Sequence, residues 1–132
     1  MIGLIVETDP NEEAYAAFDL DATLAEYLKE DSGNTPIGHV VIPMYEKIKW
    51  YQAHGIKCKL LTARAGFASE VPKIEAWLQY NDQFFPGLAK LEISNVKSHK
   101  MLVLYDDRAV QIIPNTGMMV GSEKYIQGYP FN

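Results

Sequence analysis

The length and composition of the chain are those of a single globular domain. Its 132 residues are 48% hydrophobic and 22% charged, which excludes disordered, fibrous and membrane-spanning classes, so we expect one domain over residues 1–132. The formal net charge of -5 disfavours a dedicated nucleic-acid binder, because such proteins usually carry a surplus of Lys and Arg. The N-terminus has no signal-peptide pattern and the single cysteine, Cys58, lies in an apolar stretch. We therefore expect a cytoplasmic protein that has no membrane partner.

The first half of the chain predicts alternating strands and helices. Met1–Glu7 and Tyr15–Leu20 are strand-like, and the D-P-N sequence between them is typical of a turn. The polar segment 25–38 is typical of a loop or small flap. Apolar residues recur at helical spacing over Val40–His54, and a strand is expected at Ile56–Thr62.

The third quarter of the chain predicts a second helix and a short strand. Ser69 is a candidate N-cap for a helix that runs to about Tyr80. Segment 84–91 contains a Pro-Gly pair and is expected to be irregular. A short strand is expected near Leu91–Ser94.

The last quarter predicts two more strands and completes an α/β pattern. Met101–Tyr105 is a continuous apolar run, which indicates a central strand covered on both faces. Another strand is expected at Val110–Ile113. The aromatic tail from 118 onward is expected to pack on the edge of its own sheet, and the alternative is that it covers the site of a neighbouring subunit. The alternation predicts a Rossmann-like parallel sheet with helices on both faces.

Polar residues follow the ends of the predicted strands. The carboxyl ends of parallel strands meet at one edge of a sheet, so a single site is expected there. The residues expected at this edge are Asp19, Asp21, Thr62, Lys97, Asp106 and Asp107.

Asp19 and Asp21 lie two residues apart on an extended segment, so their side chains project to the same side. In phosphoryl transfer one carboxylate can attack phosphorus while the other moves a proton. The alternative interpretation of these two residues is a capped turn or a fragment of a calcium loop.

Two further polar residues suit the binding of a phosphoryl group. Thr62 offers a hydroxyl and backbone N–H groups at a strand end, although such a residue is more often a cap. Arg64 beside it is expected to be a solvated charge. Lys97 can neutralise the phosphoryl charge, with Lys100 as its rival for that role.

Asp106 and Asp107 end a buried apolar run, where adjacent carboxylates repel each other unless a cation is near. Mg²⁺ prefers oxygen ligands and few protein carboxylates, which matches Asp19, the carbonyl of Asp21, and Asp106. An ion pair with Arg108 is the simpler alternative.

The ordered segments F-D-L-D-A-T-L, L-L-T-A-R, a lysine and L-Y-D-D-R resemble the haloacid dehalogenase superfamily of aspartate-nucleophile phosphatases. The likeness spans about Ala16 to Gly117. The run L-Y-D-D-R-A-V-Q, followed by P-N-T-G, is similar to a subgroup of small hydrolases common in phage and bacterial genomes.

The resemblance assigns a role to each candidate residue. It implies Asp19 as nucleophile and metal ligand, and Asp21 as general acid/base and backbone ligand. Ala22 stands where the family usually has glycine, which is tolerable unless the backbone there needs a positive φ. The remaining implied roles are phosphate binding for Thr62, charge stabilisation for Lys97, and metal binding for Asp106 with Asp107.

Segments 25–38 and 66–95 leave little room for the cap domain that many members of this superfamily carry. An open, capless site suits a bulky phosphorylated substrate, or a substrate enclosed by a second subunit of a homo-oligomer.

The function expected from the sequence is a Mg²⁺-dependent phosphomonoesterase that forms an aspartyl-phosphate on Asp19. Nucleotides and polynucleotide phosphate ends are the substrates considered, and binding to nucleic acid is left open. One alternative is a receiver-like phosphoacceptor module. In receiver domains, however, the acidic pair comes before the phosphoacceptor in the chain, whereas here the pair Asp106-Asp107 comes last. The other is a metal-binding protein without catalysis.

Overall fold

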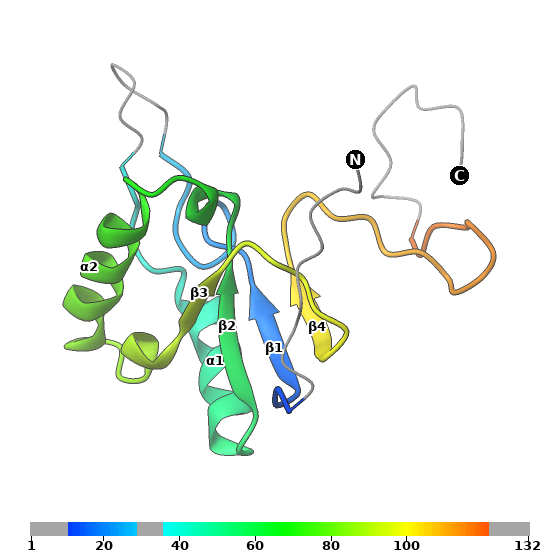
Figure 1. Ribbon diagram of the computed structural model, residues 1–132, viewed down its shortest axis with the longest axis horizontal. Helices are drawn as coiled ribbons and strands as arrows, with labels where there is room; N and C mark the ends of the chain where they lie inside the picture. The colour runs from blue at the N-terminus through cyan, green and yellow to red at the C-terminus, as the bar shows by residue number, and fades with distance from the viewer. Residues whose placement is uncertain (1–10, 29–35, 122–132) are drawn as a thin grey trace.

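The fold is a small α/β domain, and the computed structural model describes residues 11–28 and 36–121 (Figure 1). The predicted strand at Met1–Glu7, the middle of the predicted flap and most of the aromatic tail lie outside the described residues. The elements are β1 (Tyr15–Phe18), α1 (Ile42–Ala53), β2 (Lys57–Leu61), η1 (Ala63–Gly66), α2 (Val71–Asp82), η2 (Leu88–Lys90), β3 (Glu92–Ser94) and β4 (Met101–Tyr105).

The four strands form one parallel sheet in the order β3-β2-β1-β4. All four residues of β1 are buried, as expected for a strand with neighbours on both sides. Phe18 at the end of β1 lies opposite Leu60 of β2 and Tyr105 of β4. The predicted parallel α/β sheet is confirmed, and its carboxyl ends are aligned at one edge.

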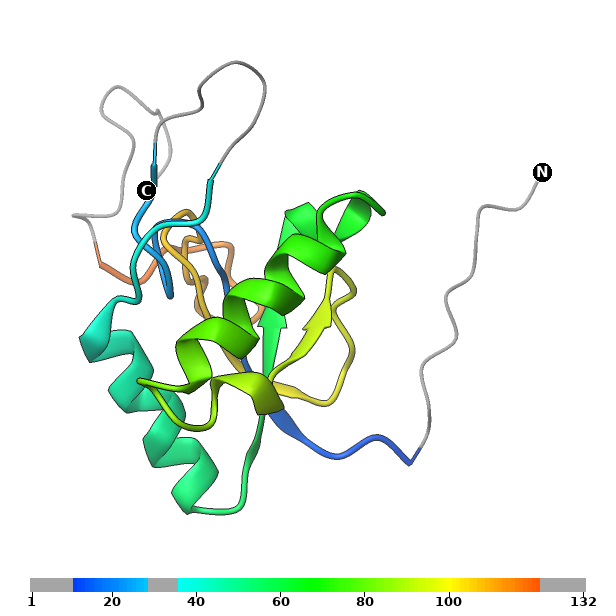
Figure 2. The ribbon, with the colours of Figure 1, turned by 90° about the vertical axis from the view of Figure 1, so that its left-hand side faces the viewer.

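Both α-helices pack on the same face of the sheet (Figure 2). Ala16, Phe18 and Leu60 on that face form one core with Ile48 of α1 and Ile74 of α2. Right-handed crossovers that step from β1 to β2 to β3 in one direction put both helices on one side. The return from β3 to β4, residues 95–100, has no helix. Helices were expected on both faces of the sheet, but in the described part of the chain both α-helices lie on one face. None of the described helices is long and apolar enough to cross a bilayer.

Proline sets the start of each helix. α1 and α2 carry Pro43 and Pro72 in the first turn, where the fixed φ suits a helix and the missing N–H costs nothing. The predicted cap at Ser69 is wrong, because the helix is preceded by Glu70 and no side chain caps it. An N-cap side chain accepts the backbone N–H of the residue two or three positions later. Three positions after Ser69 is Pro72, which has no N–H.

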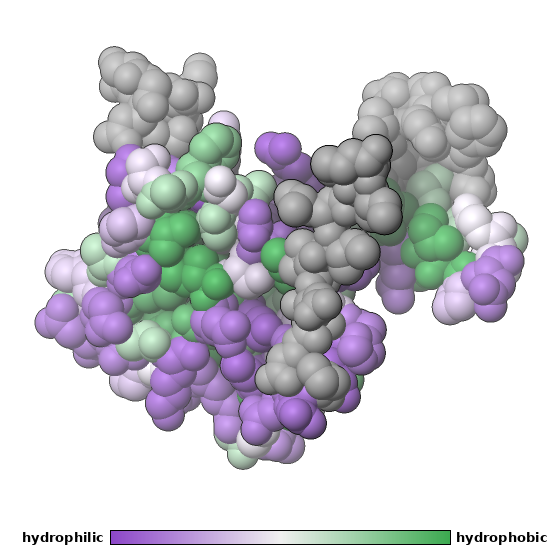
Figure 3. Space-filling model, in the orientation of Figure 1, coloured by the Kyte–Doolittle hydropathy of each residue, from purple (hydrophilic) through white to green (hydrophobic). Residues whose placement is uncertain are grey.

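The last part of the sheet differs from the prediction in two ways. β4 has the predicted bounds but lies at the edge of the sheet, and Leu102 is 60% exposed. The predicted strand at Val110–Ile113 is wrong, because this segment makes only an isolated bridge from Ile112 to Met119. The segment is one side of a short hairpin whose exposed hydrophobic residues are visible beyond β4 (Figure 3).

Candidate active site

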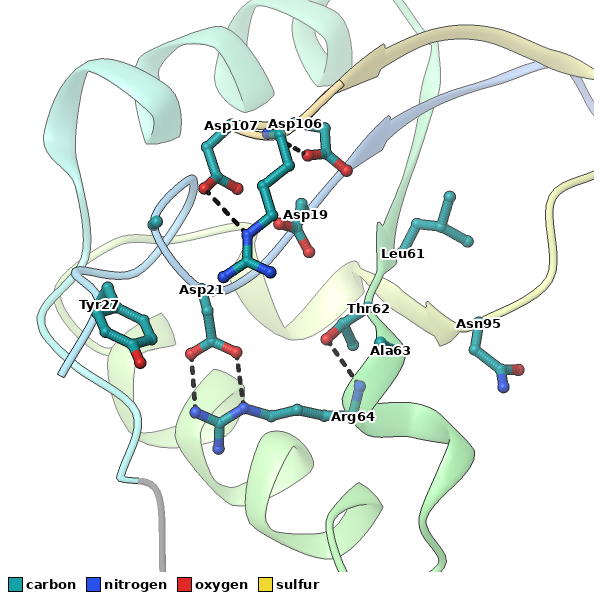
Figure 4. A pocket seen from close by; sticks show the side chains of 12 residues that line it. Asp19, Asp21, Tyr27, Leu61, Thr62, Ala63, Arg64, Asn95, Asp106 and Asp107 are labelled. Atoms are coloured by element: carbon teal, nitrogen blue, oxygen red, sulfur yellow. Dashed lines mark hydrogen bonds and ion pairs between the residues drawn. The ribbon is translucent and has the colours of Figure 1, made fainter. Parts of the chain in front are cut away.

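A pocket of about 460 Å³ opens at the carboxyl ends of the strands (Figure 4). The residue that follows each strand lines it: Asp19 after β1, Thr62 after β2, Asn95 after β3 and Asp106 after β4. Two backbone hydrogen bonds extend the ladder into the site, from Asp19 N–H to the Tyr105 carbonyl at 2.9 Å and from Thr62 N–H to the Ser94 carbonyl at 2.9 Å. The sheet itself therefore fixes the backbone of the site.

Three carboxylates meet in this pocket. Asp19, Asp106 and Asp107 each offer one oxygen, and these oxygens lie within 4.8 Å of one another. An all-oxygen set from three carboxylates fits a hard cation, so the triad could hold a metal ion. The triad contains three of the four residues expected at the metal. Asp21 was expected to contribute its backbone carbonyl, which a set of side-chain oxygens does not test, and its carboxylate is not part of the triad.

The environment of Asp19 favours its protonated form in the absence of a cation. The pKa of Asp19 is raised to about 7, chiefly by desolvation and also by the nearby charges of Asp106 and Asp107, against a hydrogen bond from the Leu20 backbone that lowers it. The ordinary pKa of an aspartate carboxyl group is 3.8. A bound cation would reverse this preference, because it stabilises the ionised group.

Neighbouring polar groups hold the other two members of the triad. The backbone N–H of Arg108 donates to Asp106 Oδ1 at 2.7 Å. The hydroxyl of Thr23 lies 3.5 Å from Asp107 Oδ1, and Arg108 Nε lies 3.9 Å from Asp107 Oδ2. The ion pair that the sequence offered as an alternative is therefore long, and the Arg108 side chain is largely exposed.

Asp21 pairs with Arg64 instead of joining the triad. Arg64 Nε and Nη2 donate to the two oxygens of Asp21, each at 2.7 Å. Arg64 also donates to Glu70 Oε1 at 3.2 Å, and its side chain is only 11% exposed. The prediction of a solvated Arg64 is therefore wrong. The bond to Asp21 is the main reason that the pKa of Arg64 is raised.

Thr62 is buried at the pocket wall, and its hydroxyl accepts the backbone N–H of Arg64 at 3.2 Å. This bond caps η1, as the simpler interpretation of Thr62 expected. The cap does not exclude phosphate binding, because a hydroxyl can still donate while it accepts.

Neither candidate lysine lines the pocket. The Lys100 carbonyl accepts the N–H of Tyr15, the first residue of β1, so Lys100 lies at the opposite edge of the sheet. Ser98, next to Lys97, bonds to the Tyr15 hydroxyl. The 95–100 connection thus leads away from the site soon after Asn95.

Arg64, Asn95 and Tyr27 line the pocket but were not among the predicted site residues. Asn95 follows the rule that identified Asp19 and Asp106, since it is the first residue after a strand. Arg64 carries no such signal, because its role depends on a partner in a distant segment. Tyr27 belongs to the segment that was expected to form a flap.

The thiol of Cys58 is buried in the core, as the sequence predicted. Burial raises its pKa to about 11, so it is not a reactive nucleophile.

Comparison of the chain with protein-family models, with curated proteins and with solved structures found no match.

Proposed function

We propose that this protein is a magnesium-dependent phosphomonoesterase that works through an aspartyl-phosphate on Asp19. The observation that carries the proposal is the convergence of three carboxylate oxygens within 4.8 Å at the carboxyl ends of β1 and β4. Bound Mg²⁺ would balance the charge of these carboxylates and polarise a phosphoryl oxygen. Asp19, Asp106 and Asp107 are the side chains that would hold it.

In the first step, a carboxylate oxygen of Asp19 attacks phosphorus and the bond from phosphorus to the ester oxygen breaks. Asp21 donates a proton to the departing alcohol, and the hydroxyl of Thr62 donates a hydrogen bond to a phosphoryl oxygen. Arg64 and Arg108 are the cations that line the pocket, so we assign charge stabilisation to them rather than to Lys97.

In the second step, water attacks the phosphorus of the aspartyl-phosphate while Asp21 accepts a proton from that water. The phosphorus–oxygen bond to Asp19 breaks, which releases inorganic phosphate and restores the carboxylate. Both steps require that Asp21 leave its pair with Arg64 for part of the cycle, because a bidentate guanidinium occupies both of its oxygens.

Hydrolysis of p-nitrophenyl phosphate with and without Mg²⁺ tests this proposal. Turnover should require Mg²⁺, should be abolished by Asp19→Asn, and should fall roughly 10²- to 10⁴-fold in Asp21→Asn, as for loss of a general acid. Glu75→Gln removes an exposed carboxylate on α2 and should leave the rate unchanged. Equal rates in wild type and Asp19→Asn would contradict the assignment.

One observation favours a second candidate, a protein that does not hydrolyse phosphate esters efficiently. It would be either a phosphoacceptor module or a metal-binding protein without catalysis. Arg64 occupies both carboxylate oxygens of Asp21, the proposed acid, with two hydrogen bonds of 2.7 Å. A receiver-like module would take up one equivalent of phosphate from acetyl phosphate and retain it. A protein without catalysis would bind Mg²⁺ and take up none.

A further inference from the structure

Tyr27 is a large aromatic side chain at the wall of the pocket, and it is 58% exposed. No other aromatic residue is among the described residues that line the pocket. Within the described parts of the chain, Tyr27 has no hydrogen-bond partner and no ring contact. Much of an aromatic ring is thus exposed at the edge of the site, and aromatic faces are the usual platforms for planar ligands.

The backbone that leads into Tyr27 is fixed to the opposite side of the flap base. The N–H of Glu26 donates to the His39 carbonyl at 2.8 Å, and Ala25 bridges Val40 in antiparallel fashion. Gly38 packs so closely on Glu26 that a Cβ there would lie 2.3 Å from the Glu26 carbonyl oxygen. The ring is therefore carried on an anchored segment.

The position of Tyr27 relative to Asp21 identifies which part of a substrate it would meet. This step rests on the proposed function, in which Asp21 protonates the departing oxygen. The leaving group must then lie beside Asp21, and Tyr27 flanks Asp21 in the pocket, on the side away from Thr62 and Asn95 (Figure 4). Tyr27 accordingly lies on the leaving-group side of the site.

We infer that Tyr27 stacks on the base of a nucleoside monophosphate and that this contact makes nucleotides the preferred substrates over phosphate esters without a ring. The pocket volume of about 460 Å³ is in the range of small-molecule sites. The four carboxylates in its lining disfavour a long polyanion, so a free mononucleotide fits better than the end of a polynucleotide.

The test compares adenosine 5′-monophosphate with ribose 5-phosphate, which keeps the sugar and the phosphate but lacks the base. With Mg²⁺ present, the wild-type kcat/KM should be about tenfold or more higher for the nucleotide, as stacking of one base supplies. Tyr27→Ala should bring that ratio close to one. Tyr27→Phe should keep the ratio, because it retains the ring.

Tyr80→Ala is the matched control, since Tyr80 is an exposed tyrosine on α2 that does not line the pocket, and it should keep the wild-type ratio. A wild-type ratio near one, or an equal fall in Tyr27→Ala and Tyr27→Phe, would overturn the inference while the phosphatase stands. Absence of phosphate release from both esters would overturn the proposed function together with it. A 5′-phosphorylated oligonucleotide hydrolysed more efficiently than the mononucleotide would overturn the choice of a free nucleotide.

Discussion

Ala22 has a backbone φ of 64°, in the left-handed region that favours glycine. This is the condition under which the methyl group at this position was expected to matter. Its N–H donates to the Ala25 carbonyl at 2.8 Å, so the tight turn after Asp21 keeps Ala22 in that conformation. An L-residue there costs roughly 1–2 kcal/mol.

Ala22→Gly should therefore stabilise the fold by about 0.5 to 1 kcal/mol, because the relief of strain exceeds the extra backbone entropy that glycine loses. Urea unfolding measures the change. Ala76→Gly, at an exposed position inside α2, should instead destabilise by about 1 kcal/mol. A loss of stability in Ala22→Gly would show that the turn is not strained.

The second residue-scale feature is the bidentate ion pair between Arg64 and Asp21. Arg64→Ala should cost about 2 kcal/mol in the free energy of unfolding, since hydrogen bonds to charged groups are lost and Asp21 and Glu70 lose their shared partner. Lys73→Ala is the comparison, because Lys73 also pairs with Glu70 but is 52% exposed, and it should cost less than about 1 kcal/mol. The effects of Arg64→Ala and Asp21→Asn should not add.

The third is the proton on Asp19. Its pKa in the fold, about 7, lies above the ordinary value of 3.8, so the folded state holds the proton more tightly than the unfolded chain does. The stability of the metal-free protein should consequently fall as pH rises from about 4 to about 7. Asp19→Asn should raise the melting temperature at pH 8 and change it little at pH 4, whereas Glu75→Gln should show no such difference. Equal effects of Asp19→Asn at both pH values would contradict the raised pKa.

At the scale of elements, the flap base depends on the close contact between Gly38 and Glu26. Gly38→Ala places a Cβ against backbone atoms, at 2.3 Å from the carbonyl oxygen, and should destabilise the fold by about 1–3 kcal/mol through overpacking. Gly66→Ala meets only the end of the Asn95 side chain, at 3.3 Å, and should be nearly neutral. Thermal unfolding of both variants compares them directly. Similar losses of stability in the two variants would mean that the backbone around Gly38 shifts to accommodate the added Cβ at little cost.

The strand ends were the part of the site that sequence could predict. Asp19, Thr62 and Asp106 each end an apolar run, and parallel pairing brings such residues to one edge. Lys97 could not be placed, because a connection without a helix or strand gives no sequence signal for its path. The partner of Arg64 was equally out of reach, since it lies 43 residues away in the chain.

The order of the strands was beyond the sequence as well. An apolar run such as Met101–Tyr105 is the same signal for a central strand and for an edge strand, and only the pairing with β1 decides between them. Leu102 is exposed, so one face of β4 is not covered by other elements of the described chain, although the apolar run had predicted a strand buried on both faces.

At the scale of the whole molecule, the proposed cation should act as a stabilising ligand. The melting temperature of the wild type should rise with Mg²⁺ concentration, and at 100 times the dissociation constant the gain should be about 2.7 kcal/mol. Asp106→Asn removes one member of the triad and should abolish most of that gain. Glu46→Gln, an exposed carboxylate on α1, should keep it. A rise of the same size in Asp106→Asn would place the ion elsewhere.

The place of β1 between β2 and β4 also governs when the site appears during synthesis. β1 is made first among the described strands, and its β4 neighbour is made last. A nascent chain on the ribosome thus contains Asp19 long before it contains Asp106, and until then one edge of β1 has none of the described strands beside it. A message cut short before codon 106 would encode a helix-covered sheet fragment that carries the proposed nucleophile without the groups that would bring a cation to it.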